Sequence, residues 1–212
     1  SLMGWVEFMK LTSEDDEGYD PRLFLEQVRK ICSDMERDLT RLRKIANRFN
    51  QIGSPPALSN ADINSIIEDA RQYLSMRLPL LRKRIDIRTS YGMTPKVRVN
   101  GDLLEWVLEN LMKNAVDAID AENGRLELKT EYVEVDGIVR VQLTDNGRGI
   151  GWENQRKVFS PGYTTKKRGW GLGLTLAKRI VEDYHNGRIY VSWSQKGAGT
   201  TFCVDLPVRE VA

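Results

Sequence analysis

The apolar positions of residues 21–52 recur at alternating intervals of three and four, with charged residues filling most positions between them. This heptad pattern predicts a long helix that pairs with other helices along one seam. Flanking apolar residues widen the seam, which favours a multi-helix bundle over a narrow two-stranded coil. A helix that packs on its own domain is the alternative. The seam consists of Leu25, Val28, Cys32, Met35, Leu39, Leu42, Ala46 and Phe49.

Residues 4–12 and 21–52 together suggest a helical hairpin whose first arm is short. Gly53-Ser-Pro-Pro56 ends the second arm, because successive prolines remove backbone donors and favour extended backbone. The sequence therefore predicts a boundary there, with a helical-hairpin dimerisation segment at 1–56 and a second domain at 57–212.

In the second domain, segments whose apolar residues have helical spacing are interspersed with segments that have the pattern of strands. Ser59 and Asn60 are capping candidates for the first helix after the boundary, and Asp102 for the next. Helical spacing marks residues 63–74, 102–119 and 172–181. Short strands are predicted at 85–89, 96–99, 138–144, 188–193 and 200–206.

Composition and charge narrow the function classes only slightly. The 32 basic and 30 acidic residues give a net charge of +2, which supports neither a nucleic-acid partner nor a membrane surface. Cys32 and Cys203 lie far apart without metal-ligand spacing, which suits a reducing compartment such as the cytoplasm. No apolar run is long enough to span a bilayer, so we expect a segment without membrane contact, although the parent protein could be membrane-anchored.

A strand-end aspartate is the first candidate for chemistry. Asp145 has the parity of the apolar residues of the strand at 138–144, so its carboxylate is aimed into the apolar layer, where it needs a donor. Gly147 and Gly149 then let the backbone turn and another group approach closely. This pattern predicts an acceptor at the floor of a pocket for a flat ligand such as a nucleotide base. A plain turn is the alternative, because Asn146-Gly147 is itself a turn signal.

Two asparagines four residues apart are the second candidate. Asn110 and Asn114 project from one side of their predicted helix, with Lys113 and Asp117 close by. Amide oxygens can help to hold a magnesium ion that bridges substrate phosphates. The alternative, in which one amide caps a neighbouring element, is more credible for Asn110 than for Asn114.

The third candidate is the long polar connection at 151–168, which runs directly into Gly169-Trp-Gly-Leu-Gly-Leu174. An irregular connection of this length is typical of a mobile lid, and its Thr-Thr-Lys-Lys-Arg run could meet a polyphosphate. Glycines before a helix expose amides at the positive end of its dipole, which favours an anion. The single histidine, His185, falls at a predicted helix end and is expected to be a cap rather than a phosphate acceptor.

These motifs occur in the order and spacing of a known family. The chain resembles the ATP-binding catalytic domain of sensor histidine kinases, in the GHKL ATPase superfamily, over about residues 58–208. Its heptad helix resembles the second helix of the family's dimerisation hairpin. The residues of its motifs look most similar to those of the nitrogen-regulation branch. The matching motifs are Asn110-Leu-Met-Lys-Asn-Ala115, Asp145-Asn-Gly-Arg-Gly149, Phe159-Ser-Pro-Gly-Tyr-Thr-Thr-Lys166 and Gly169-Trp-Gly-Leu-Gly-Leu174.

The resemblance implies an α/β (α+β) two-layer sandwich with a mixed β-sheet and helices on one face. It implies that Asp145 accepts a hydrogen bond from adenine beside Gly149, that Asn114 holds Mg²⁺ of Mg-ATP, and that Asn110 and Lys166 lie near the phosphates. Asn110, Asn114 and Lys166 are thus the implied catalytic residues. The other implied nucleotide-binding residues are Lys113, Asp117, Gly147, Ile150, Phe159, Thr164, Thr165, Gly169, Gly171, Leu172, Gly173, Leu174 and Thr201.

The resemblance also implies a function, but the histidine that this function requires as phosphoryl acceptor is missing from the sequence. The family phosphorylates a histidine in the first hairpin helix, and no such segment occurs in this sequence. We therefore expect the cytoplasmic catalytic portion of a two-component sensor kinase, a homodimer through the hairpin. Such a kinase phosphorylates a histidine upstream of residue 1 and relays the phosphoryl group to the receiver domain of a response regulator.

Two alternatives come from other functional classes. One is a GHKL protein-serine kinase or conformational ATPase that acts on a separate partner. The heptad hairpin and the asparagine at position 110, where clamp-type ATPases generally place a glutamate, argue against a clamp. The other is a non-catalytic dimerisation module, which the nearly intact motif set makes a poorer reading.

Overall fold

The computed structural model describes residues 28, 29, 32, 56–81, 83–120, 123–166 and 171–208. The chain divides into two compact units, 1–54 and 55–212. In the first unit, Val28, Arg29 and Cys32 are described and all three are helical. The rest of the predicted hairpin lies outside the described residues, so the elements below all belong to the second unit.

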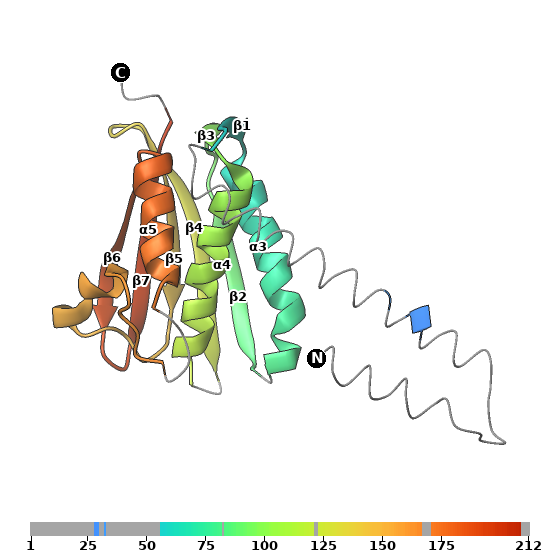
Figure 1. Cartoon of the computed structure of the whole chain (residues 1–212), viewed down its shortest axis with the longest axis vertical. Helices are drawn as coiled ribbons and strands as arrows, with labels where there is room; N and C mark the ends of the chain where they lie inside the picture. The colour runs from blue at the N-terminus through green and yellow to red at the C-terminus, as the bar shows by residue number, and fades with distance from the viewer. Residues whose placement is uncertain are drawn as a thin grey trace. The chain divides into compact units, whose positions relative to one another are not determined.

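The second unit is built on a five-stranded sheet with the order β2-β4-β5-β7-β6 (Figure 1). The β2–β4 pair is parallel and the other three pairs are antiparallel, which confirms the predicted mixed sheet. A small second sheet pairs β1 with β3. The strands are β1 (Ser59–Ala61), β2 (Ile85–Tyr91), β3 (Val97–Val99), β4 (Gly124–Val133), β5 (Ile138–Asp145), β6 (Arg188–Gln195) and β7 (Gly199–Pro207).

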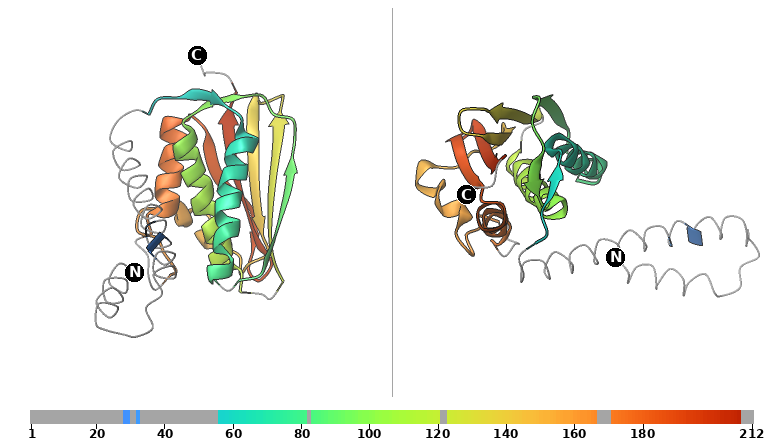
Figure 2. Two further views of the ribbon diagram at one scale, coloured as in Figure 1. Left: turned by 90° about the vertical axis from the view of Figure 1, so that its right-hand side faces the viewer. Right: turned by 90° about the horizontal axis from the view of Figure 1, so that it is seen from above.

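Three helices cover one face of this sheet and form the second layer (Figures 1 and 2). They are α3 (Ile63–Arg77), α4 (Gly101–Ala118) and α5 (Gly173–Arg179), the last of which continues as a π-helix, Ile180–Tyr184. The apolar side chains between the layers are almost fully buried and form one core. This two-layer arrangement confirms the predicted fold class.

The caps of α3 and α4 differ from the predicted ones by a few residues. Asp62 and Asn100 are the N-caps, each accepting a hydrogen bond from a backbone N–H of the first turn. Ser59 and Asn60 belong instead to β1, and Asp102 lies in the first turn of α4. At the other end of α4, the ammonium group of Lys83 donates to the carbonyl oxygens of Val116 and Ile119, at 2.5 and 2.6 Å. These bonds satisfy carbonyls that a helix end leaves free.

The pairing of β5 with β7 decides which side chains face the helices. Along β5, every second residue up to Asp145 is buried beneath them. Asp145 is opposite Thr200, and Leu143 is opposite Phe202. Thr200 and Phe202 therefore share the helix-covered face with Asp145, because paired residues point to the same side of a sheet.

Three 3₁₀ turns complete the unit, η1 (Pro79–Leu81), η2 (Trp152–Asn154) and η3 (Lys157–Phe159). The last two give local structure to the polar connection that follows β5. Within the part of the chain that the structure describes, no helix is both long and apolar enough to cross a membrane.

Candidate functional site

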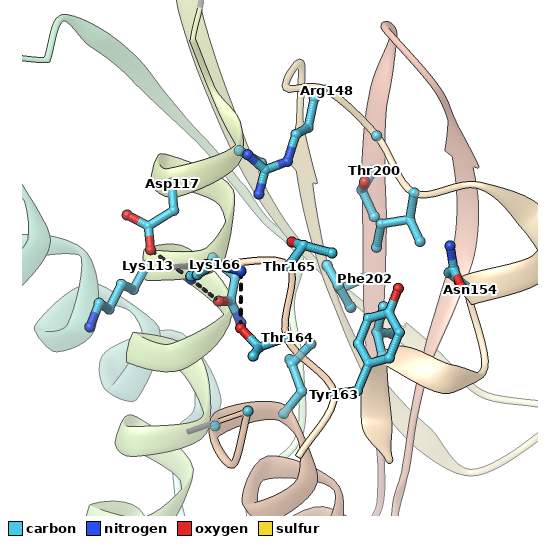
Figure 3. A pocket seen from close by; sticks show the side chains of 18 of the residues that line it. Lys113, Asp117, Arg148, Asn154, Tyr163, Thr164, Thr165, Lys166, Thr200 and Phe202 are labelled. Carbon is cyan, nitrogen blue, oxygen red and sulfur yellow. Dashed lines mark hydrogen bonds and ion pairs between the residues drawn. The ribbon is translucent and has the colours of Figure 1, made fainter. Parts of the chain in front are cut away.

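A cavity of about 1020 Å³ lies between α4, the end of β5, the connection at 151–166 and the start of α5 (Figure 3). It is large for a small-molecule site, for which about 300–1,000 Å³ is typical. Most of the residues implied by the motifs line it. They are Asn110, Lys113, Asn114, Asp117, Asp145, Gly149, Ile150, Thr164, Thr165, Lys166, Gly171, Leu172, Gly173 and Leu174.

The α4 side of the cavity carries a row of polar side chains. Asn110, Lys113, Asn114 and Asp117 recur every three or four residues, so they project from one face of the helix. The Asn110 amide donates to the Trp106 carbonyl oxygen one turn back, at 2.9 Å, which leaves its own oxygen toward Gly173. This bond is a local anchor within α4 rather than the cap of a neighbouring element.

Asp145 is a buried carboxylate at the end of β5. It is 3% exposed and accepts a hydrogen bond from the Gly147 N–H, at 2.8 Å. Burial raises the pKa of Asp145 to about 6, although the Gly147 and Thr200 N–H groups oppose the rise. At neutral pH the carboxylate is therefore ionised, and it can accept a hydrogen bond from a ligand that enters the cavity.

The turn after Asp145 is tied to its surroundings at several points. The Arg148 N–H donates to the last carbonyl of α4, that of Ala118, at 2.9 Å. The Ile150 N–H donates to Ser194 Oγ on β6, at 2.7 Å. Gly149 has a φ of +69° and lies so close to β6 that a β-carbon would be 2.0 Å from the Gln195 carbonyl oxygen. The turn needs glycine here for both its backbone conformation and its close approach.

Three implied site residues that the structure describes do not line the cavity. Thr201 lies on the opposite face of the sheet, where its hydroxyl is 3.0 Å from that of Thr144. The prediction was wrong by one residue, because the register of β7 gives this place to Thr200. Phe159 is buried behind the cavity, edge-on to Phe202 with ring centroids 6.2 Å apart, and Gly147 acts through its bond to Asp145. Gly169 lies outside the described residues.

Several cavity residues were not predicted from the sequence. Thr200 and Phe202 could have been identified from strand parity had the register of β7 been known. Ala118 is the last residue of α4, and the others lie in the connections that follow β5 and β6. The full set is Ala118, Arg148, Gly151, Asn154, Val158, Tyr163, Lys196, Thr200 and Phe202.

The charges of the lining suit an anionic ligand with an apolar part. Two lysines, Lys113 and Lys166, lie with Asp117 at one end, and Tyr163, Asn154 and Phe202 lie at the other (Figure 3). Cations and backbone amides at the start of a helix attract phosphates, whereas an aromatic wall beside a buried acceptor suits a base. The residues present thus fit a nucleotide in both charge and shape.

His185 stands outside this site. It is 4% exposed, its Nε2 accepts from the Asn100 N–H at 3.0 Å, and its Nδ1 lies 2.7 Å from the Ile180 carbonyl oxygen, to which it donates. Burial lowers its pKa, so the ring is neutral. Both ring nitrogens are engaged in hydrogen bonds. A histidine in this position closes the end of a helix and offers no free nitrogen to a phosphoryl group.

Known proteins are similar to this chain in sequence and in fold. Sensor histidine kinase ZraS of Escherichia coli strain K12 is 32% identical over 86% of this chain and 38% of its own. Sensory histidine kinase/phosphatase NtrB of Vibrio alginolyticus is 30% identical over 79% of this chain and 49% of its own, so this chain spans less than half of either relative. The solved catalytic domain of histidine kinase ThkA is 28% identical, with a TM-score of 0.62 over 71% of this chain and 95% of that domain.

One family model matches the part of the chain that carries these motifs. It is described as histidine kinase-, DNA gyrase B- and HSP90-like ATPase, and it matches residues 99–210, from the start of α4 to beyond the end of β7. The chain belongs to this family of ATP-binding domains, within which its relatives are sensor histidine kinases.

Proposed function

We propose that this chain is the catalytic portion of a two-component sensor histidine kinase, which binds Mg-ATP and transfers its γ-phosphoryl group to a histidine. The observation that carries the proposal is the cavity itself, whose lining combines a buried carboxylate with two lysines and an asparagine pair. The names of the relatives ZraS and NtrB agree with it.

The nucleotide would be held by three groups of residues. Asp145 accepts from the adenine amino group, with Gly149 and Phe202 beside the base. Lys166 and the amides at the start of α5 meet the phosphates. Asn114, with Asn110 one turn back, supplies amide oxygens to the first or second coordination sphere of magnesium, which prefers oxygen ligands.

The chain contributes positioning and charge compensation, which is most of what phosphoryl transfer needs. Magnesium, when bound, neutralises charge on the phosphates. Lys166 adds a further positive charge, and Asp145 fixes the base so that the phosphates reach the open side of the cavity. No side chain has to form a covalent bond with the phosphoryl group.

The acceptor is a histidine other than His185. That side chain is the only imidazole in the sequence, and it is buried with both nitrogens engaged. We propose an acceptor on a polypeptide segment outside these 212 residues, a homodimer formed through residues 1–56, a cytoplasmic location and relay to the aspartate of a response regulator. The heptad seam supports the dimer.

Titration calorimetry with ATP, with and without Mg²⁺, tests the nucleotide part of the proposal. We expect magnesium-dependent binding that is lost in Asp145→Ala. Thr201→Ala is the matched control, because its side chain lies on the other face of the sheet, and it should bind as the wild type does. Absence of binding to the wild type would overturn the proposal.

Phosphoryl transfer is tested separately, with γ-labelled ATP and the chain fused at its N-terminus to the acceptor helix of ZraS. Acid-labile, alkali-stable label on the fusion, and none on the chain alone, is the expected result. Acid-stable label on serine would favour a protein-serine kinase, and phosphate release without label would favour an ATPase; either result would contradict the histidine-kinase assignment while leaving the nucleotide site intact.

A further inference from the structure

The ammonium group of Lys166 contacts two side chains of α4. Its Nζ lies 2.9 Å from Asn114 Oδ1 and 2.7 Å from Asp117 Oδ2 (Figure 3). Asn114 and Asp117 are three residues apart, so their oxygens are neighbours on the helix surface. The two contacts attach the segment that follows η3 to the wall of the cavity.

The Asn114 contact matters because of the role proposed for that oxygen. If magnesium bonds this oxygen directly, at about 2.0–2.1 Å, its two positive charges repel an ammonium group held within hydrogen-bond distance of the same atom. Lys166 and the metal therefore exclude each other at Asn114 Oδ1.

The Asp117 contact does not suffer from this conflict. A carboxylate has two oxygens and several lone pairs, so it can keep a lysine when the neighbouring amide is taken. The side chains of Lys166 and Asp117 are 34% and 36% exposed, and an ion pair this accessible is weak enough to adjust its geometry readily. Asp117 can thus retain Lys166 at the cavity edge while the amine turns from Asn114 toward the phosphates.

We infer that Asp117 is a positioning residue for Lys166 and that the lysine and the divalent cation occupy Asn114 Oδ1 alternately. This inference rests on the proposed function, because it needs Mg-ATP as the ligand. It has two consequences. Asp117 contributes to phosphate binding only through Lys166, and Lys166 partly substitutes for the metal when magnesium is withheld.

The first consequence is tested by calorimetry with Mg-ATP and with adenosine on wild type, Asp117→Asn, Lys166→Met and the double variant. Asp117→Asn should weaken Mg-ATP binding about fivefold, leave adenosine binding unchanged and have no further effect beside Lys166→Met. Asp69→Asn, an exposed carboxylate on α3, is the control and should change neither ligand.

The second consequence is tested by the ratio of ATP affinities with and without Mg²⁺. The ratio should be larger in Lys166→Met than in wild type, since no lysine is left to neutralise phosphates in the absence of metal. An unchanged or smaller ratio would contradict the substitution of Lys166 for the metal.

The outcomes separate the inference from the proposed function. A wild type that binds no Mg-ATP overturns both. A wild type that binds Mg-ATP, together with an Asp117→Asn variant that matches it, overturns the inference alone. An Asp117→Asn loss that also affects adenosine, or that persists beside Lys166→Met, would mean that Asp117 supports the fold of α4 and not the lysine.

Discussion

The side-chain oxygen of Asn110 lies 2.9 Å from the point that a β-carbon would occupy at Gly173. Gly173 is the first residue of α5, and this near-contact is where α4 and α5 meet beside the cavity. Because Gly173 has no side chain, the Asn110 amide fits beside it without a steric clash.

Gly173→Ala should weaken ATP binding without lowering the stability of the fold. Alanine favours the helix by up to about 1 kcal/mol, so the thermal midpoint should hold or rise, whereas crowding of Asn110 should lower the ATP affinity several-fold. Gly101→Ala is the control, because its nearest outside atom is the Ile66 Cδ1 at 3.9 Å, and it should bind ATP normally. Equal affinities in the two variants would contradict this role of Gly173.

Gly149→Ala should be severely destabilising. The residue has a φ of +69°, and the new β-carbon would meet the Gln195 carbonyl oxygen at 2.0 Å. We expect a loss of about 3 kcal/mol in the free energy of unfolding, measured by urea titration. Gly137→Ala has a similar φ of +63° with no atom within 4 Å, so it should cost only about 1 kcal/mol. The difference between the two losses gives the cost of the steric contact alone, because both substitutions carry a similar backbone strain.

Adenosine affinity should depend on pH through Asp145. Its carboxyl pKa is raised to about 6, and the protonated form is the poorer acceptor for an amino group. Binding should therefore weaken as the pH falls below about 6, with adenosine chosen because it has no phosphate to titrate. Calorimetry over this range should show little pH dependence in Asp145→Asn. A wild-type affinity that is constant across the range would contradict the role of Asp145.

Asp145 should also affect the pH dependence of stability. Because its folded pKa of about 6 lies above the ordinary value of 3.8, the folded chain binds the proton more tightly than the unfolded chain between these values. The stability of wild type relative to Asp145→Asn should therefore fall as the pH rises through this window, by up to about 3 kcal/mol. Urea unfolding of both proteins at several pH values gives this difference directly.

His185 should contribute in the opposite direction. Burial lowers its folded pKa below the ordinary value of 6.5, so its contribution to stability is present above that pH and is lost as the pH falls toward the folded value. His185→Leu removes the partner of the buried Asn100 N–H and should cost about 2 kcal/mol near neutral pH. The gap between wild type and variant should narrow in acid, and a gap that widened would mean that the ring is charged in the folded chain.

The sequence predicted the type of most elements because their apolar periods are regular. The alternation along β5 located Asp145 on the buried face, and the spacing of Asn110 and Asn114 brought them to one wall of the cavity. The strand β4 was missed, although Leu126 and Leu128 alternate with charged residues in the same way.

Other features of the site depend on relationships between distant segments. Which of Thr200 and Thr201 faces the cavity depends on the register between β5 and β7, and a change of one residue exchanges the two faces. The pairing of Lys166 with Asp117 depends on the path of an irregular segment across the site. Neither can be deduced from a local period, because both are set by contacts between residues far apart in the chain.

The turn between β4 and β5 is a suitable site for attaching a reporter group to the protein. Val135 in that turn is 98% exposed, and Asp145 lies seven positions along β5 from Ile138, or roughly 23 Å of extended chain. A fluorophore or a fused reporter domain attached at Val135 would therefore sit at the end of the strand remote from the ligand. It could report on tumbling or assembly of the protein without competing for the cavity.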